Sequence, residues 1–333
     1  MNQLIECVPN FSEGVNVAVI DQIAHAIKNV NGVKLLNVDP GKAANRTVFT
    51  FVGSPGAVVE AAYQAIKMAG QLIDMRAQKG EHPRMGTTDV CPLIPIADIT
   101  MEETVEYAKQ LAERVGTELQ IPVYLYEDAQ PDKRRSNLSV IRAGEYEGFF
   151  IKIKQPGWVP DFGPAENDAK RGATVIGARK LLIAYNINLN TQSTELANAI
   201  AFDVRESGRS KPERKPGKLR SVKAIGWFIK EYRVAQVSMN LTDTTVTPIH
   251  LAFDEVCKAA KDRGVSVTGS ELIGLIPLRS LVDAGRYFLR KQQLDDNISE
   301  AELIAVAVQA MGLDELAPFE PRARIIEYLL QDN

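Results

Sequence analysis

The predicted order of strands and helices occurs twice along this chain, and this repeat constrains the fold more than any other feature. The first copy comprises predicted strands at residues 4–8, 33–38, 47–52 and 90–96 and helices at 20–27 and 55–75. The second comprises predicted strands at residues 181–189, 222–229, 234–241 and 265–270 and helices at 195–206 and 247–263. Both copies read strand, helix, strand, strand, helix, strand, which is the split βαβ motif. We therefore expect an α/β (α+β) fold with two ferredoxin-like subdomains built on mixed sheets, and an internal duplication is plausible.

The expected boundary between the subdomains follows a long segment without clear periodicity. Residues 134–174 are rich in glycine, proline and charged residues, and they follow a predicted helix at 102–118 and a strand at 123–126. Loops of this length in a compact domain usually bind something. We expect an N-terminal subdomain at residues 1–180 and a C-terminal subdomain at 181–333, the second ending in helices.

The composition indicates a globular protein that acts on small molecules. Hydrophobic residues make up 45% of the chain, and 39 Lys and Arg residues balance 42 Asp and Glu residues. Such a balance lacks the broad basic field with which proteins bind nucleic acids or anionic membranes. We expect neither as a partner.

The cysteines and the hydropathy pattern favour the cytoplasm. Cys7, Cys91 and Cys257 lie far apart and form no paired framework, which is typical of a reducing compartment. The N-terminus does not resemble an export signal, and no apolar run is long enough to span a membrane. No metal-binding spacing and no glycine-rich nucleotide fingerprint occurs, so we expect no metal site.

One of the three histidines stands out as a candidate catalytic residue. His82 lies in the loop KGEHPRMG at residues 79–86, beside Glu81 and Arg84. An imidazole with an ordinary pKa of about 6.5 can transfer protons in both directions near neutrality, although a histidine that merely caps a turn is the alternative. His25 and His250 lie on predicted helices, and we expect both at the surface.

Two further features bear on this candidate site. Asp39 and Arg46 stand at opposite ends of a predicted turn, which forms either a local ion pair or a corner that recognises a carboxylate near His82. Cys91 follows His82 by nine residues, and a Cys–His nucleophilic pair must be weighed. We favour a buried apolar role for Cys91, because Val90 and Pro92 flank it.

A basic run covers residues 205–223, with eight Lys and Arg residues against Glu206 and Glu213. A solvated loop is the simpler interpretation. The alternative is a flap that steers or clamps an anionic substrate.

The chain also resembles the formiminotransferase family, the glutamate formimidoyltransferases. The resemblance rests on several long motifs, among them ECVPNFSEG at 6–14, NRTV at 45–48, KGEHPRMG at 79–86, IRAGEYE at 141–147 and PDFGP at 160–164. Shorter matches lie at residues 89–92, 122–126, 172–175, 177–180, 226–227 and 325–329. Together they span nearly the whole chain, and no residues remain for a cyclodeaminase domain, so we expect the free-standing transferase.

The resemblance implies transfer of the formimino group from N-formimino-L-glutamate to N5 of tetrahydrofolate, with His82 as the acid–base residue. The chemistry of this reaction makes Asp39 and Glu81 the candidates to stabilise the cationic intermediate electrostatically, and Arg46 and Arg84 the candidates to bind substrate carboxylates. The resemblance further implies a homodimer, a substrate tunnel between the subdomains and, as co-substrate, tetrahydrofolate, including forms with a polyglutamate tail. The implied folate-binding residues are Gly163, Pro164, Ala165, Glu166, Asn167, Asp168, Ala169, Lys170, Arg171 and Gly172. Formyl transfer to glutamate, cyclisation of 5-formyltetrahydrofolate and folate binding without turnover stay open as alternatives.

Overall fold

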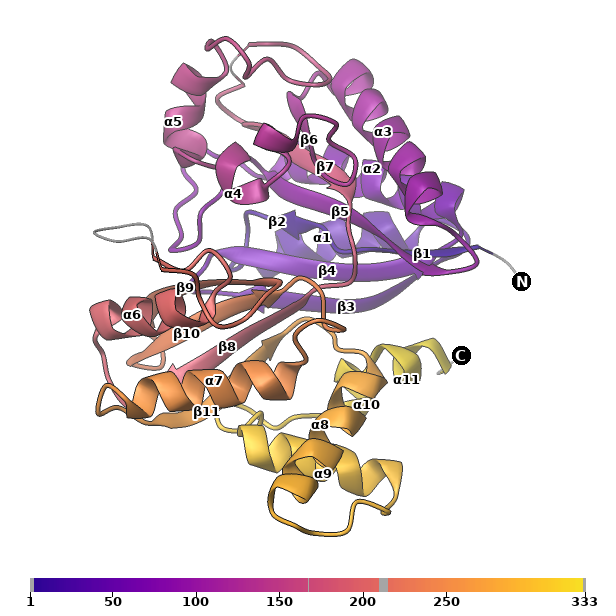
Figure 1. Cartoon of the computed structure of the whole chain (residues 1–333). Helices are drawn as coiled ribbons and strands as arrows, with labels where there is room; N and C mark the ends of the chain where they lie inside the picture. The colour runs from indigo at the N-terminus through magenta and orange to yellow at the C-terminus, as the bar shows by residue number, and fades with distance from the viewer. Residues whose placement is uncertain (1–2, 167, 210–214, 332–333) are drawn as a thin grey trace. The chain divides into compact units, whose positions relative to one another are not determined.

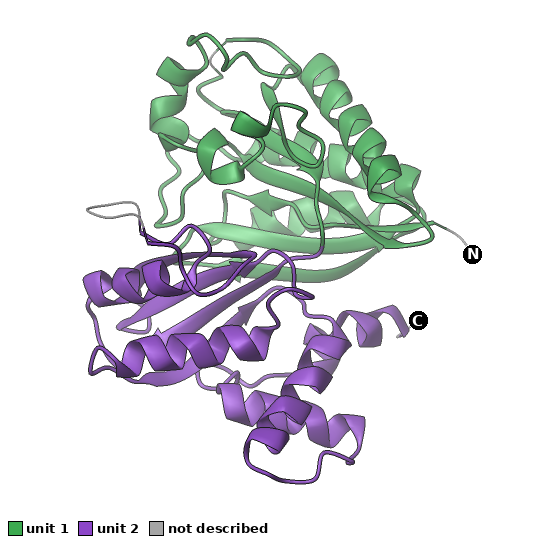
Figure 2. Ribbon diagram, in the orientation of Figure 1, with its two compact units in different colours: residues 1–180 green, residues 181–333 purple. Residues whose placement is uncertain are grey.

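The computed structural model describes residues 3–166, 168–209 and 215–331. The chain divides into two compact units, residues 1–180 and residues 181–333, which we call unit 1 and unit 2 (Figure 2). Each unit has its own hydrophobic core of buried side chains. The units are described separately below.

Unit 1 contains a seven-stranded mixed sheet (Figure 1). Its strands are β1 (Leu4–Cys7), β2 (Asn10–Phe11), β3 (Val33–Gly41), β4 (Arg46–Gly53), β5 (Thr88–Ala97), β6 (Val123–Glu127) and β7 (Thr174–Ala178). Its helices are α1 (Val17–Lys28), α2 (Pro55–Leu72), α3 (Met101–Glu118), η1 (Lys133–Arg135), α4 (Leu138–Ile141) and α5 (Glu145–Lys152). β1 and β2 form an interrupted strand between β4 and β5, and β3 pairs with β4. This is the ferredoxin-like arrangement that the repeat predicted.

The three long helices of unit 1 begin where the sequence offers capping groups. The Asn16 side chain accepts hydrogen bonds from the first turn of α1, and Thr100 and Glu103 form a capping box at α3. Pro55 occupies the first turn of α2, where its missing N–H costs nothing. The buried faces of α1, α2 and α3 join one core cluster with alternate residues of the sheet.

Two features of unit 1 differ from the sequence-based expectation. Residues 134–174 are not wholly irregular, because they include the short helices α4 and α5, which are too brief for helical periodicity to reveal. β7 was also not predicted. It lies parallel between β5 and β6 and is buried on both faces, so its five residues show no alternation.

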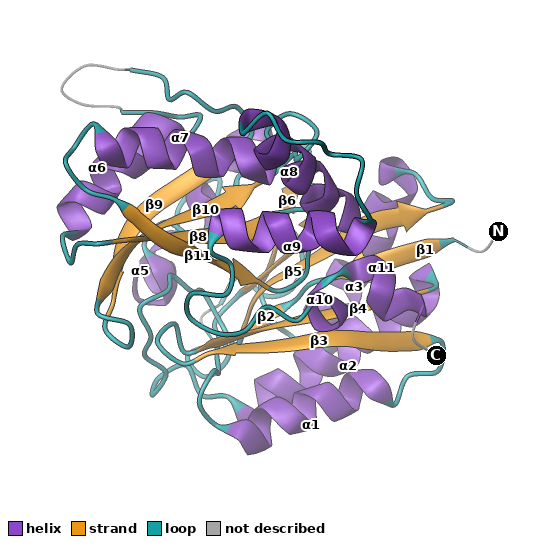
Figure 3. Cartoon of the chain, turned by 90° about the horizontal axis from the view of Figure 1, so that it is seen from below, coloured by secondary structure: helices purple, strands orange, loops and turns teal. Residues whose placement is uncertain are grey.

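Unit 2 is built on a four-stranded sheet in the order β11-β8-β10-β9. Its strands are β8 (Ile183–Leu189), β9 (Val222–Ile229), β10 (Val234–Leu241) and β11 (Val267–Ile273). Its helices are α6 (Thr194–Val204), α7 (Ile249–Lys261), α8 (Leu278–Lys291), α9 (Glu300–Met311), α10 (Pro321–Arg324) and α11 (Ile326–Gln331) (Figure 3). The strands and the helices α6 and α7 repeat the order of unit 1.

The expectation of a mixed sheet in unit 2 is wrong. All three pairings are antiparallel. The second unit lacks counterparts of β6 and β7, the strands that supply the parallel pairings of unit 1. In their place the chain continues into α8 and α9, which pack against each other. Within the described ranges, no helix is both long and apolar enough to cross a membrane.

Candidate active site

His82 lies in unit 1, in the loop between α2 and β5. Its Nδ1 atom is 2.7 Å from Nη1 of Arg46 and 2.8 Å from the carbonyl oxygen of Pro83. These contacts fix the ring from its Nδ1 side. Nε2 is the second titratable nitrogen of the ring.

Arg46 is the first residue of β4, and the sheet itself positions its side chain. Its Nε donates to Oδ1 of Asn10 at 2.9 Å, and Asn10 lies on β2, the neighbouring antiparallel strand. Its Nη1 donates to Oδ2 of Asp89 at 2.8 Å. The contacts at Nε and Nη1 place the guanidinium beside His82.

Asp89 is a further residue of this site, and it was not among the residues predicted from the sequence. The residue is fully buried near the start of β5. Its Oδ2 accepts hydrogen bonds from Arg46 and, at 2.7 Å, from Nη2 of Arg142, and its Oδ1 accepts from the backbone of Met85 at 3.0 Å. The sequence did contain a signal for Asp89, namely a charged residue near the start of an apolar strand, because a buried carboxylate requires partners.

The cluster of Arg46, Arg142 and Asp89 carries more positive than negative charge. Arg46 and Arg142 share the single carboxylate of Asp89, and Nε of Arg142 is buried without a hydrogen-bond partner in the described structure. Burial, and then the charges of Arg46 and Arg142, lower the pKa of His82 well below its usual 6.5, although the Pro83 carbonyl opposes this. Burial likewise lowers the pKa of Arg46 to about 10. His82 is therefore neutral at pH 7.

The other residues predicted to support the substrate lie in different settings. Asp39 is half-buried on β3, in register with Val48 of β4. Glu81 is exposed, and its backbone N–H donates to the Ala43 carbonyl oxygen at 3.3 Å. The roles of both in substrate binding stay predictions.

Arg84 is buried and joins the histidine loop to α5. Its guanidinium lies 3.2 Å from Glu145 and 2.8 Å from Glu147, and its Nε donates to Gln78 at 2.8 Å. The two glutamates come from the motif at residues 141–147, which also supplies Arg142. Arg84 therefore links the histidine loop to α5, a structural role that its position two residues after His82 did not suggest.

The predicted folate segment, residues 163–172, is anchored by its C-terminal part. Lys170 donates to the carbonyl of Gln71 at 2.8 Å and Arg171 to that of Leu119 at 2.5 Å, so both cations lie at helix C-termini, where the helix dipole favours them. Gly163, Ala165, Glu166 and Ala169 are exposed. Asn167 lies outside the described residues, and the role of the segment stays a prediction.

A backbone bridge joins this segment to the histidine loop. Gly86 and Gly172 pair as an isolated antiparallel bridge. A Cβ atom at Gly172 would lie 2.2 Å from the Met85 oxygen, and one at Gly86 would lie 2.3 Å from the Ala173 oxygen. Only glycine allows this approach, so the two segments that the sequence singled out lie together.

The cysteines and the remaining histidines take no part in this site. Cys91 is buried with its Sγ 3.5 Å from that of Cys7, consistent with the expected apolar role. His25 is exposed, as predicted. The surface position predicted for His250 is wrong, because the ring of Tyr287 from α8 stacks on it at 4.5 Å and leaves it 8% exposed.

The basic run is only partly visible, because residues 210–214 lie outside the described part of the chain. In the visible part, Arg209 pairs with Asp203 at 3.7 Å and Lys218 pairs with Glu255 at 3.4 Å. Both cations therefore already form ion pairs within unit 2. The proposed role in steering an anionic substrate stays a prediction.

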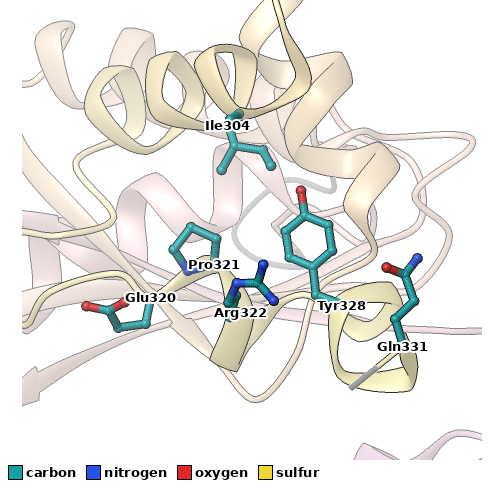
Figure 4. A pocket seen from close by; sticks show the side chains of 7 residues that line it. Ile304, Glu320, Pro321, Arg322, Tyr328 and Gln331 are labelled. Carbon is teal, nitrogen blue, oxygen red and sulfur yellow. The ribbon is translucent and has the colours of Figure 1, made fainter. Parts of the chain in front are cut away.

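Two other features of the described residues bear on where a site can lie. No group of three or more His, Cys, Asp or Glu side chains is arranged to hold a metal ion among them. A cavity of about 450 Å³ in unit 2 is lined by residues of α9, α10 and α11, including Glu320, Arg322 and Tyr328 (Figure 4). It contains no histidine or cysteine to transfer a proton or act as a nucleophile.

Comparison with known proteins gives matches over both units. Residues 4–179 match the family model described as the formiminotransferase domain, N-terminal subdomain, and residues 184–331 match the formiminotransferase domain. The chain is 51% identical to the formimidoyltransferase-cyclodeaminase of Mus musculus over its full length, and spans 61% of that relative. It is 42% identical to the glutamate formimidoyltransferase of Streptococcus pyogenes serotype M1, with 89% of this chain and 96% of that protein aligned. The glutamate formimidoyltransferase of Thermoplasma acidophilum is 43% identical, with 90% and 97% aligned.

Proposed function

This chain belongs to the formiminotransferase family, and from that membership we propose that it transfers the formimino group of N-formimino-L-glutamate to N5 of tetrahydrofolate. L-glutamate is the second product. Support comes from relatives named glutamate formimidoyltransferase that align over nearly their whole length. The arrangement of His82, Arg46 and Asp89 in unit 1 also suits this chemistry.

The reaction needs a group that both takes and gives a proton. Attack of the secondary amine N5 on the amidine carbon forms a tetrahedral intermediate in which N5 carries an extra proton. The C–N bond to glutamate then breaks, and the departing nitrogen must gain a proton. One imidazole can accept the first proton and deliver the second, so the step balances without another reagent.

His82 is the residue that we assign to this task, and the observation that carries the assignment is the pair of contacts that Arg46 and the Pro83 carbonyl make with its Nδ1 atom, which orient the ring. A base must be unprotonated to act, and burial beside two guanidiniums keeps His82 neutral at physiological pH. The same cations make its protonated form short-lived, which favours delivery of the proton to the leaving nitrogen. Removal of a general acid–base residue costs about 10²–10⁴-fold in rate.

The charges around His82 also suit the substrates that we propose. Formiminoglutamate and the glutamate tail of folate both carry carboxylates, and two guanidiniums against one buried carboxylate leave the site net positive. We assign folate contacts to the exposed part of the segment at residues 163–172. The proposal includes a cytoplasmic homodimer that uses tetrahydrofolate as co-substrate and needs no metal; the free cysteines agree with that compartment.

The test is a transfer assay on wild type, His82→Ala and His25→Ala. Product is detected by its conversion in acid to the methenyl chromophore, and folate binding is measured separately. We expect His82→Ala to lose about 10²–10⁴-fold in kcat with folate affinity retained. His25→Ala is the matched control, because that histidine is exposed on α1, and it should behave as wild type.

Two outcomes would contradict the proposal. Wild type that binds folate and forms no chromophore would favour formyl transfer, cyclisation of 5-formyltetrahydrofolate or binding without turnover. Full activity in His82→Ala would leave the reaction intact but remove His82 from it.

A further inference from the structure

The Nδ1 atom of His82 contacts two groups that make opposite demands on it. Nη1 of Arg46 lies 2.7 Å away and the Pro83 carbonyl oxygen 2.8 Å away. A guanidinium only donates hydrogen bonds, and a carbonyl oxygen only accepts them. Nδ1 can therefore satisfy one partner at a time: it accepts from Arg46 when it is bare and donates to Pro83 when it carries the proton.

The partner that Nδ1 binds determines whether Nε2 can donate a proton to a substrate or accept one from it. In a neutral imidazole, a bare Nδ1 means that Nε2 carries the proton, and a protonated Nδ1 leaves a lone pair on Nε2. The contact with Arg46 thus gives an Nε2 that cannot accept a proton. The contact with Pro83 gives an Nε2 that can act as a base.

The geometry favours the Arg46 contact in the ligand-free protein. A hydrogen bond from a charged donor is about twice as strong as one between neutral groups, and 2.7 Å is at the short end for such a bond. Asp89 holds the guanidinium in place, because the Nη1 atom that contacts His82 also donates to Oδ2 of Asp89 at 2.8 Å. The two hydrogens on Nη1 serve these two short contacts, and the Pro83 carbonyl oxygen is a third, more distant neighbour of Nη1 at 3.5 Å.

The same site has a means of drawing Arg46 away. Arg46 and Arg142 share one carboxylate, and Nε of Arg142 is buried without a hydrogen-bond partner in the described part of the chain. A second carboxylate would balance the charge and satisfy unused donors. The product that we propose, L-glutamate, carries two carboxylates, as does the donor substrate.

We propose that Arg46 holds His82 in the Nε2–H tautomer until a carboxylate of the donor substrate engages the guanidinium, after which Nδ1 binds Pro83 and Nε2 becomes the base. This inference rests on the proposed function. Arg46 acts here as a positioning residue, with Asp89 behind it. The switch is balanced, because one proton leaves Nε2 for water and one water proton reaches Nδ1. The base is thereby exposed only when the anionic donor is bound.

The test reads the tautomer directly by nitrogen NMR on the full chain labelled with ¹⁵N-histidine. A bare ring nitrogen and a protonated one differ clearly in chemical shift, and His82→Ala identifies the signals of His82. We expect Nε2–H in ligand-free wild type and Nδ1–H after saturation with L-glutamate. Arg46→Met should show Nδ1–H in both states and a KM for formiminoglutamate raised by about 10-fold or more.

The matched control is Arg114→Met, since Arg114 lies on α3 in surface ion pairs with Glu60 and Glu118. It should show the wild-type tautomer in both states. Nδ1–H in ligand-free wild type would overturn the inference, and so would an unchanged tautomer when calorimetry shows glutamate bound. Neither result needs the Arg46 variant to fold. Failure of the transfer assay alone would remove the proposed function, while the ligand-free tautomer would still decide whether Arg46 sets the state of His82.

Discussion

The strands of unit 1 and unit 2 follow the same βαββαβ order but bury different polar groups. On the described strands of unit 1, Glu6 and Asp89 are buried carboxylates. On those of unit 2, the buried side chains Asn186, Asn188 and Gln236 are amides. The third strand of each repeat shows the same contrast, because β4 begins with Arg46 and β10 begins with Val234.

The difference shows how one topology can serve two purposes. A buried carboxylate changes charge with pH and requires a cation, so it links stability to protonation. A buried amide needs hydrogen-bond partners only. In unit 2, Gln236 donates to Asn188 at 2.8 Å and accepts from Trp227 at 2.9 Å, and these two bonds between uncharged side chains join three strands. Gln236 also donates to Glu271 at 3.4 Å. The proton chemistry that we propose therefore belongs to unit 1.

Asp89→Asn tests the buried charges of unit 1, and we expect it to cause the largest loss of stability among the variants proposed here. The variant leaves Arg46 and Arg142 buried without their shared carboxylate, which should cost about 3–5 kcal/mol in the free energy of unfolding. Urea unfolding measures this. Asp283→Asn is the matched control, because that carboxylate is exposed on α8, and it should change stability by less than about 1 kcal/mol. Equal effects in the two variants would contradict the prediction.

Glu6→Gln tests whether a buried carboxylate of unit 1 links stability to pH. Burial raises the pKa of Glu6 from 4.5 to about 7, against the opposing charge of Arg179. The folded protein then binds a proton that the unfolded chain lacks between these values, so wild type loses stability as the pH rises through this range. The variant should gain about 2–3 kcal/mol on wild type between about pH 5 and pH 8.

Thermal unfolding at several pH values measures that gain. Glu106→Gln removes an exposed carboxylate on α3 and should follow wild type at each pH. A constant gap between Glu6→Gln and wild type would show that Glu6 does not titrate in this range.

Gln236→Leu tests the neutral side of the comparison and should have the smallest effect of the three. It removes the hydrogen bonds from Gln236 to Asn188 and to Glu271 and from Trp227 to Gln236, at a cost of about 1–3 kcal/mol. Since the substitution removes no ionisable group, the loss should be similar at about pH 5 and pH 8. Gln22→Leu, at an exposed position on α1, is the control. A loss that varies with pH would remove the distinction between the units.

Periodicity was enough to predict most of the fold. Helix 102–118 was expected and α3 spans Met101–Glu118, while β9 and β10 have the bounds read from the sequence. These elements have one buried and one exposed face, so hydropathy marks them. β7 has two buried faces and α4 has four residues, so neither carries such a mark.

The candidate site was predictable only in part, for a related reason. The unusual composition of the loop at residues 79–86 pointed to His82, and Arg46 was expected near it. Asp89 and Arg142 were missed, because what makes them partners is the fold. Asp89 contacts Arg46 and Arg142, which lie 43 and 53 positions away in the sequence. The residues around Asp89 in the chain give no indication of these partners. The tautomer of His82 depends on such tertiary neighbours.

The backbone bridge between Gly86 and Gly172 limits how the sequences of proteins with this fold can diverge. Any side chain at either position would collide with a backbone oxygen of the opposite segment, and backbone cannot be exchanged by mutation. Substitutions can accumulate on either side of the bridge, including in the exposed residues near 165, without moving His82. With the folate contacts and the proton transfer that we propose for these two segments, a lineage can alter which ligand it accepts while His82 keeps its place, so that ligand preference and reactivity evolve separately.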